Sequence, residues 1–219
     1  MARAALQHPA FLLIEFLILC VLVPTLIIVN TWASLMFLFL WGASLYAFGI
    51  HKYTTQKTIK QIWKWDAVKW DALKPILFRW VLASIAMLIF LMWYDPDRLF
   101  FLPRTRPEFL PTLMTMYPVM SALPQELIFC TFFFARYTRY FGNGKWMVLA
   151  SALTFAYAHI LYINPVAPTL SFFGGLIFAM TYLKTKSLAL VTIEHGLYGN
   201  VLFIIGLGWY FYSGSVATG

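Results

Sequence analysis

A small set of polar side chains interrupts the apolar C-terminal half of this sequence. Ionisable groups within apolar segments are costly, by about 2.5–3.5 kcal/mol each on insertion scales, so they usually face one another or a wet cavity and mark function. One carboxylate and two histidines, supplied by three separate apolar segments, are the components of a catalytic or metal site. The polar residues concerned are Gln125, Glu126, His159, Glu194, His195 and Asn200.

The composition places the chain among polytopic membrane proteins. Of its 219 residues, 62% are hydrophobic and only 11% are charged, which leaves too little polar surface to cover a soluble globule. The net charge of +8 is concentrated between long apolar runs, where lysine and arginine act as anchors facing anionic lipid. We therefore expect the lipid bilayer as a partner and no nucleic acid. Cys20 and Cys130 lie within apolar runs and form no metal-ligand pattern.

The apolar runs predict an all-α fold, a transmembrane helical bundle of about seven or eight helices with a polar intramembrane cavity. We expect one integral-membrane domain over residues 1–219, comprising an N-terminal helical hairpin (1–50), a basic interfacial segment (51–74) and a core that carries the site (109–212). The predicted spans cover residues 10–29, 32–50, 75–94, 109–135, 146–163, 168–183 and 188–212, the last of which is either one helix or two helices broken near residues 206–208.

The distribution of lysine and arginine predicts the orientation. Residues 51–79 are rich in lysine, and Ile59, Ile62, Trp63 and Trp70 recur at helical spacing, which indicates an amphipathic helix in the headgroup region. An excess of basic residues next to spans marks the cytoplasmic side, so we expect a cytoplasmic N terminus in a bacterial inner membrane. Glu15, near the start of the first span, is expected to reach the interface as a snorkelling carboxylate.

This topology also predicts depth. Glu126 and His195 lie about nine and eight residues from the cytoplasmic ends of their spans, so both come roughly 12–14 Å below that surface, and His159 comes near 20 Å. All three can therefore meet in the inner half of the membrane.

The order and spacing of these residues resemble the CPBP family of intramembrane proteases, which includes the eukaryotic CAAX prenyl endopeptidase. The family signatures EExxxR, FxxxH and HxxxN correspond to QELIFC from Gln125, FAYAH ending at His159, and HGLYGN from His195. The resemblance covers residues 123–210. It implies an all-helical membrane fold with a polar cavity, and hydrolysis of a peptide bond near the cytoplasmic side by a water molecule activated by glutamate and histidine without a metal.

The sequence departs from these signatures at three positions. Gln125 replaces the leading glutamate, and a neutral amide cannot take a proton from water, so that role passes to Glu126 or is lost. Cys130 stands at the arginine position. Gly199 stands four residues after His195, at the asparagine position of the third signature, and Asn200 follows one residue later. On a regular helix this one-residue shift turns the Asn200 side chain by ~100°. Asn200 therefore reaches the same cavity only if a π-bulge distorts the helix.

We predict an intramembrane endopeptidase acting on a membrane-embedded or membrane-proximal peptide or protein. Glu126 is expected to take the proton of water, with His159 orienting the water or sharing that proton. His195, helped by Asn200 or Gln125, is expected to donate to the oxyanion. Glu194 points away from His195 by ~100° and is expected to pair elsewhere in the membrane.

Three alternatives stay open. No cofactor is favoured, but Glu126, His159 and His195 are also a possible zinc ligand set, although the HExxH pattern is absent. The polar residues are also compatible with a non-catalytic relative that binds a membrane partner, in which they hold helices together, and Gln125 and Cys130 favour this reading. A small proton-coupled or ion-coupled transporter is less favoured because the chain lacks the repeated halves of that class.

Overall fold

The computed structural model describes residues 2–211, which are mainly helical and contain no strand. The all-α prediction is confirmed. Six helices in this part of the chain are long and apolar enough to cross a membrane, so the chain is an integral membrane protein. They are Pro9–Val29, Trp32–Thr55, Trp70–Tyr94, Pro107–Arg136, Val166–Thr185 and Leu188–Ile205.

The first two spans form the predicted hairpin. After the short helix α1 (Ala2–Leu6), the chain continues through α2 (Pro9–Leu17), the π segment η1 (Ile18–Leu22) and α3 (Val23–Val29). The turn follows at Asn30 and Thr31, where Thr31 has a φ of 55°. The return limb is the 3₁₀ segment η2 (Trp32–Leu35) followed by α4 (Met36–Thr55).

The basic segment is broken, so the prediction of one amphipathic helix is wrong. Gln56, with a φ of 58°, ends α4, and Lys64, with a φ of 50°, separates α5 (Ile59–Trp63) from the 3₁₀ turn η3 (Trp65–Ala67). Trp70 belongs to the next helix, and only Ile62 of the predicted apolar stripe is buried. The segment is fixed by tertiary contacts instead, because the Lys64 Nζ donates to the Thr185 carbonyl at 2.8 Å.

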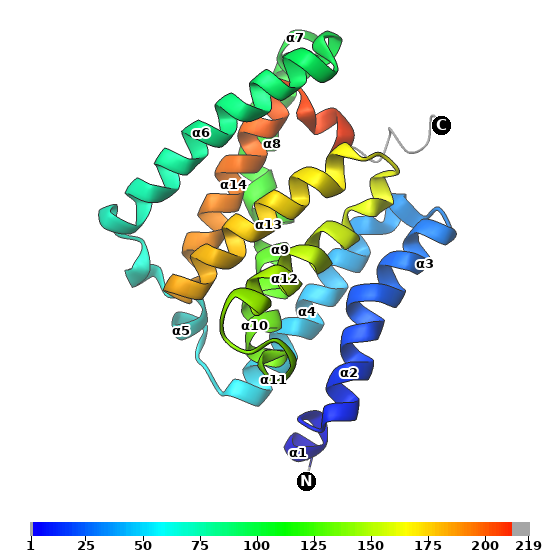
Figure 1. Ribbon diagram of the computed structural model, residues 1–219, viewed down its shortest axis with the longest axis vertical. Helices are drawn as coiled ribbons and strands as arrows, with labels where there is room; N and C mark the ends of the chain where they lie inside the picture. The colour runs from blue at the N-terminus through cyan, green and yellow to red at the C-terminus, as the bar shows by residue number, and fades with distance from the viewer. Residues whose placement is uncertain (1, 212–219) are drawn as a thin grey trace.

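The third span is α6 (Trp70–Tyr94), which lies along the outside of the bundle (Figure 1). The connection that follows contains η4 (Pro96–Arg98), α7 (Phe101–Thr105) and η5 (Pro107–Phe109). Figure 1 shows α7 at the opposite end of the bundle from α5 and α11 (Thr138–Phe141). The charge-rich connections at α5 and α11 therefore lie at one end of the bundle and the connection at α7 lies at the other, as the predicted topology requires.

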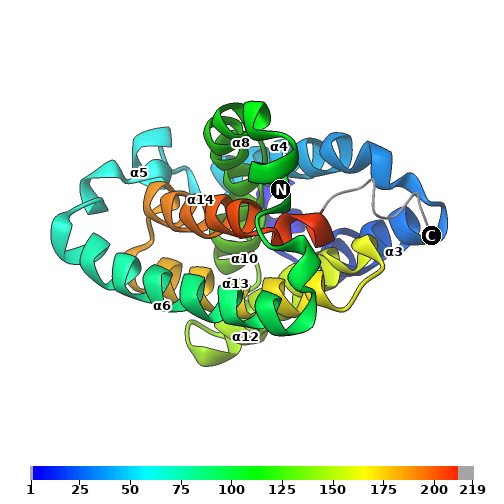
Figure 2. The ribbon, with the colours of Figure 1, turned by 90° about the horizontal axis from the view of Figure 1, so that it is seen from above.

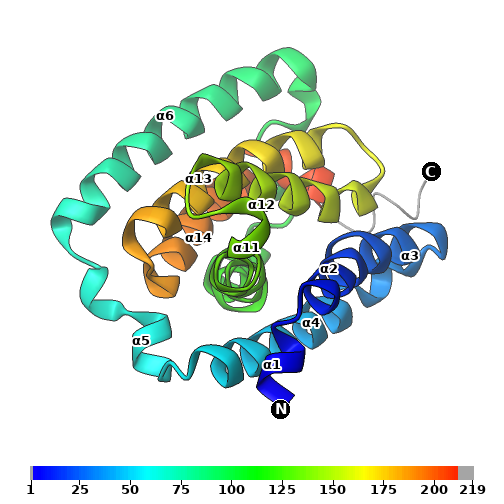
Figure 3. The same ribbon diagram turned by 60° about the horizontal axis from the view of Figure 1, so that its bottom comes forward.

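The fourth span stands at the centre of the bundle. It runs through α8 (Leu110–Tyr117), the π segment η6 (Pro118–Ala122), α9 (Leu123–Glu126), the π segment η7 (Leu127–Phe132) and α10 (Phe133–Arg136). In Figure 3 this span is seen end-on, with α12, α13 and α14 on one side and α1 to α4 on the other. Two π segments thus flank Glu126, and such segments are frequent at functional sites.

The last three helices are α12 (Lys145–Ala158), α13 (Val166–Thr185) and α14 (Leu188–Ile205), with 3₁₀ turns η8 (Ile160–Tyr162) and η9 (Leu207–Phe211). Helix α12 has 14 residues, about 21 Å, and is shorter than the predicted fifth span. The last apolar stretch is broken at Gly206, whose φ of 113° suits glycine. Seen from above, α14 lies between α6 and α8 (Figure 2).

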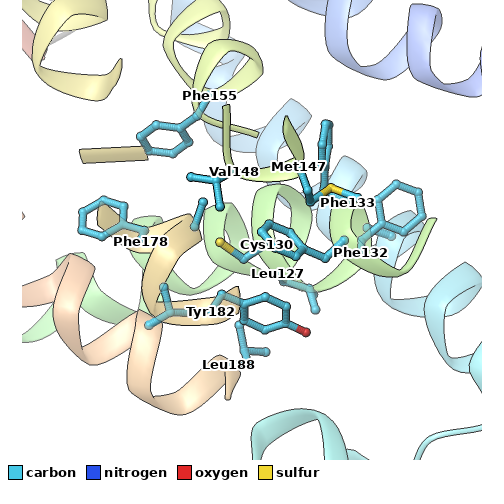
Figure 4. Packing of buried hydrophobic residues seen from close by; sticks show 14 of the residues in the cluster. Leu127, Cys130, Phe132, Phe133, Met147, Val148, Phe155, Phe178, Tyr182 and Leu188 are labelled. Carbon is cyan, nitrogen blue, oxygen red and sulfur yellow. The ribbon is translucent and has the colours of Figure 1, made fainter. Parts of the chain in front are cut away.

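The main apolar core surrounds η7 and is built largely from aromatic side chains. Figure 4 shows Cys130 among Leu127, Val148, Phe155 and Phe178, so the residue at the arginine position of the first signature is a core residue here.

Glu15 does not snorkel to the interface. It is 5% exposed and forms a two-point ion pair with Arg136, whose Nε and Nη2 lie 2.6 and 3.1 Å from the two carboxylate oxygens. The Tyr46 hydroxyl also donates to it at 2.6 Å. A carboxylate in hydrocarbon is stabilised by a charge partner when one is in reach, and the last turn of α10 supplies it.

Candidate active site

The Glu126 and His195 side chains meet inside the bundle. Glu126 ends α9 and His195 lies in the middle of α14, and the His195 Nδ1 is 2.7 Å from the Glu126 Oε1. The two residues are 1% and 5% exposed. The ring of Phe178 stacks on the imidazole, with centroids 4.5 Å apart and an interplanar angle of 17°. Buried and packed in this way, His195 has a fixed orientation relative to the carboxylate.

Tyr117 occupies the other nitrogen of the same imidazole. Its hydroxyl is 2.9 Å from the His195 Nε2, which joins Glu126, His195 and Tyr117 in one hydrogen-bonded row. Tyr117 lies in the last turn of α8, and no motif in the sequence distinguishes it from the other eleven tyrosines. Sequence reasoning missed it because only the fold brings α8 and α14 together.

His159 directly follows α12, and its ring packs near the Phe155 ring. Its Nδ1 is 2.7 Å from the Phe155 carbonyl oxygen. Because a carbonyl can only accept, Nδ1 carries the hydrogen and Nε2 is left with a free lone pair. The Phe155 ring centroid lies 4.6 Å from that of His159 and 5.7 Å from that of His195. The phenylalanine of the FxxxH signature thus packs against both histidines.

A cavity of about 860 Å³ adjoins this group. The predicted polar residues His159, His195 and Gln125 lie on its wall, and Glu126 contacts it through His195. The remainder of the wall is mainly apolar and includes Met87, Phe90, Leu113, Leu170, Ile177 and Phe203. A second cavity of about 140 Å³ reaches under the N-terminal hairpin and shares Gln125 and His159 with the first.

Gln125 and Asn200 take different places. The Gln125 Nε2 donates to the Ser121 hydroxyl at 2.8 Å, while its Oε1 is buried without a hydrogen-bond partner among the described residues. The Asn200 Nδ2 donates to the Met114 carbonyl at 3.1 Å. Helix α14 is α-helical from Leu188 to Ile205, so no π-bulge turns Asn200 toward His195. The geometry thus supports a cavity position for Gln125 and not for Asn200.

Glu194 faces away from this row, as its place beside His195 on a helix predicts. Its Oε1 accepts from the Arg79 Nη2 at 2.8 Å, and the same guanidinium donates to the Thr181 hydroxyl at 3.0 Å. The sequence interpretation placed Arg79 with the basic segment. In the structure Arg79 belongs to α6 and forms the ion pair that stabilises the buried Glu194 carboxylate. Cys130, at the arginine position of the first signature, is part of the apolar core.

Glu126, His159 and His195, the alternative zinc ligands, are not grouped around one point in the structure. Both ring nitrogens of His195 are hydrogen-bonded to protein groups, so a zinc ion there would have to displace Glu126 or Tyr117. Across residues 2–211 the structure contains no group of three or more histidine, cysteine, aspartate or glutamate side chains suited to hold a metal ion.

Residues 107–212 match the family model described as type II CAAX prenyl endopeptidase Rce1-like. A comparison with curated proteins found no match, and neither did a comparison with solved structures. The matched region contains Tyr117 and all five predicted site residues, while the N-terminal hairpin and Arg79 lie outside it. Over this region, which is just under half of the chain, the protein is similar to the Rce1-like group of the CPBP family, a family of CAAX-type intramembrane proteases.

Proposed function

We propose that this protein is an intramembrane endopeptidase that hydrolyses a peptide bond of a membrane-embedded or membrane-proximal substrate. The carrying observation is the 2.7 Å contact between Glu126 and His195 beside a cavity that also receives His159. The family match supports the reaction class. The geometry supports the choice of residues.

His159 is the general base in this proposal. Its Nδ1 hydrogen is held by the Phe155 carbonyl, so the free Nε2 can take a proton from a water molecule in the cavity. Glu126, to which the sequence interpretation gave this role, is almost fully buried and acts through His195. Although Gln125 replaces a glutamate of the signature, His159 therefore still provides a base at the cavity.

The Glu126–His195 pair stabilises the developing negative charge. The carboxylate binds Nδ1 and fixes the His195 imidazole at the cavity wall, where the oxyanion forms. Gln125 lies on the same cavity wall and contacts the substrate there. Asn200, which is bonded to Met114, has no part in this scheme.

The reaction balances with these groups alone. Water loses a proton to the His159 Nε2, and the hydroxide oxygen bonds to the scissile carbonyl carbon. The tetrahedral intermediate then collapses as the C–N bond breaks, and His159 returns the proton to the leaving nitrogen. The products are a carboxylic acid and an amine, and the enzyme is restored without a cofactor.

The chemistry of the cavity favours an apolar substrate segment. Its wall is mainly aliphatic and aromatic, and a volume of about 860 Å³ is in the range of sites that enclose sizeable ligands. The name of the matched family refers to prenylated CAAX sequences, which supply such a segment as an isoprenoid chain next to the C-terminal tripeptide. The basic residues near α5 and α11 favour a cytoplasmic position for this end and for the N terminus, in a bacterial inner membrane.

The test is hydrolysis by the purified protein in liposomes. Two probes are used, a farnesylated peptide ending in a CAAX sequence and an unprenylated single-span peptide. We expect one probe to give two fragments whose masses sum to the substrate plus one water, and we expect the same rate in a strong chelator. Cleavage that stops in chelator and returns with zinc would favour the zinc alternative.

A non-catalytic relative that binds a membrane partner is the second candidate. The specific observation in its favour is Gln125 on the cavity wall, where the family signature has glutamate. Intact probes recovered in complex with the protein, with no fragment of either, would support this candidate and contradict the endopeptidase.

A further inference from the structure

The hydroxyl of Tyr117 lies at the point where the Glu126–His195 pair meets the cavity. It is 2.9 Å from the His195 Nε2, and Tyr117 itself lines the cavity wall. Its ring is held edge-on by His195 and Phe203, with centroid distances of 5.9 and 5.3 Å. A phenol packed in this way has little freedom to turn aside, so its oxygen has a defined place beside the reacting groups.

The space for this ring exists because residue 199 is glycine. A Cβ atom built on Gly199 would overlap the Tyr117 ring. Gly199 lies four residues after His195, on the same face of α14, where a longer side chain would project beside the imidazole. The amide that α14 does carry, at Asn200, is bonded to Met114 instead. Tyr117 therefore fills the position next to His195 that a side chain from α14 would otherwise occupy.

When His195 is charged, the hydrogen-bonded row of Glu126, His195 and Tyr117 leaves the Tyr117 hydroxyl hydrogen free to donate to a group in the cavity. In the imidazolium form Nδ1–H donates to Glu126 and Nε2–H donates to the Tyr117 oxygen. The Tyr117 hydroxyl has no other partner among the described side chains, so its own hydrogen can then turn into the cavity. A hydroxyl that accepts a charge-assisted bond is also a stronger donor.

We propose that Tyr117 is a catalytic residue that donates a hydrogen bond to the oxyanion of the tetrahedral intermediate, in the place that Gly199 leaves open beside His195. The inference rests on the proposed peptide hydrolysis and names the group that contacts the substrate oxygen. No bond to Tyr117 forms or breaks, and its proton stays on the phenol throughout.

The test compares Tyr117→Phe with Tyr157→Phe on whichever probe the wild-type protein cleaves. The Tyr157 hydroxyl is bonded to Thr25 at 2.8 Å, away from the cavity, so its removal is a matched control. Loss of one oxyanion donor typically costs about 10²–10³ in kcat. We expect such a fall in kcat for Tyr117→Phe with KM unchanged and the same thermal unfolding midpoint, and no change in kcat for Tyr157→Phe.

A second pair of variants tests the place of the phenol. Tyr117→Ala opens the space beside His195, and adding Gly199→Asn supplies a new donor there from α14. We expect the double variant to exceed Tyr117→Ala in kcat by at least about tenfold, since an oxyanion donor is worth about 10²–10³. A kcat for Tyr117→Phe within threefold of the wild type, or equal kcat values for Tyr117→Ala and the double variant, would overturn the role of Tyr117. A wild-type protein that cleaves neither probe contradicts the proposed function itself.

Discussion

At the scale of single residues, two buried glutamates have separate partners and separate expected roles. Glu126 binds His195 and is buried behind it, whereas Glu194 pairs with Arg79 on the other side of α14. The sequence predicted that Glu194 turns away, because adjacent residues on a helix differ by ~100° in direction. It could not supply the partners, since Arg79 and Tyr117 are brought to α14 from helices 115 and 78 residues away in sequence.

Glu194→Gln is expected to affect stability and leave catalysis intact. The neutral amide weakens a charge-assisted bond to Arg79, whose side chain is 35% exposed, so we expect a cost near 1 kcal/mol. In a chain of this size that lowers the thermal unfolding midpoint in detergent by about 2–4 °C. We expect kcat within threefold of the wild type. A tenfold fall in kcat at an unchanged midpoint would place Glu194 in the reaction.

At the scale of elements, the helix positions followed from local composition and the contacts between helices did not. The hairpin, the turn at Asn30 and Thr31 and four further spans lie within a few residues of their predicted bounds, because apolar runs of sufficient length form membrane helices in any context. The basic segment was predicted wrongly because left-handed backbone at Gln56 and Lys64 depends on tertiary contacts such as that of Lys64 with Thr185.

The contact between the hairpin and the central span depends on Glu15 and Arg136. Both side chains are less than 5% exposed, so Arg136→Met leaves a buried carboxylate unpaired, and breaking such a pair typically costs about 3–5 kcal/mol. We expect a lower unfolding midpoint in detergent for Arg136→Met and recovery of most of the loss in Glu15→Leu/Arg136→Met. Arg139→Met, at an exposed position on α11, is the control. If Arg136→Met were as stable as Arg139→Met, the ion pair would not be what holds the hairpin against the central span.

At the scale of the whole molecule, α5 and α11 lie at one end of the bundle and α7 at the other (Figure 1). The proposed orientation therefore has a direct consequence for labelling. Cysteine introduced at Lys60 should react with an impermeant thiol reagent from the cytoplasmic side, and cysteine at Arg104 from the opposite side. Both positions are exposed, while Cys20 and Cys130 are buried and give little background. The reverse labelling pattern would show that the protein has the opposite orientation in the membrane and would contradict the proposed one.

The whole bundle also determines which predicted site residues meet. The sequence grouped Glu126, His159 and His195 by expected depth, and the fold adds the cavity that His159 and His195 share and the burial of Glu126 behind His195. Asn200 was misplaced because its position depended on a distortion that α14 does not have. The catalytic roles of these residues remain a prediction.

The most direct measurement compares kcat for Glu126→Gln and His159→Ala with that of the wild-type protein in liposomes, on a probe that the wild type cleaves. Loss of the base, or of the charge that supports His195, should lower kcat by about 10²–10⁴ while the unfolding midpoint shows that both variants are folded. Cleavage by either folded variant at the wild-type rate would contradict the account.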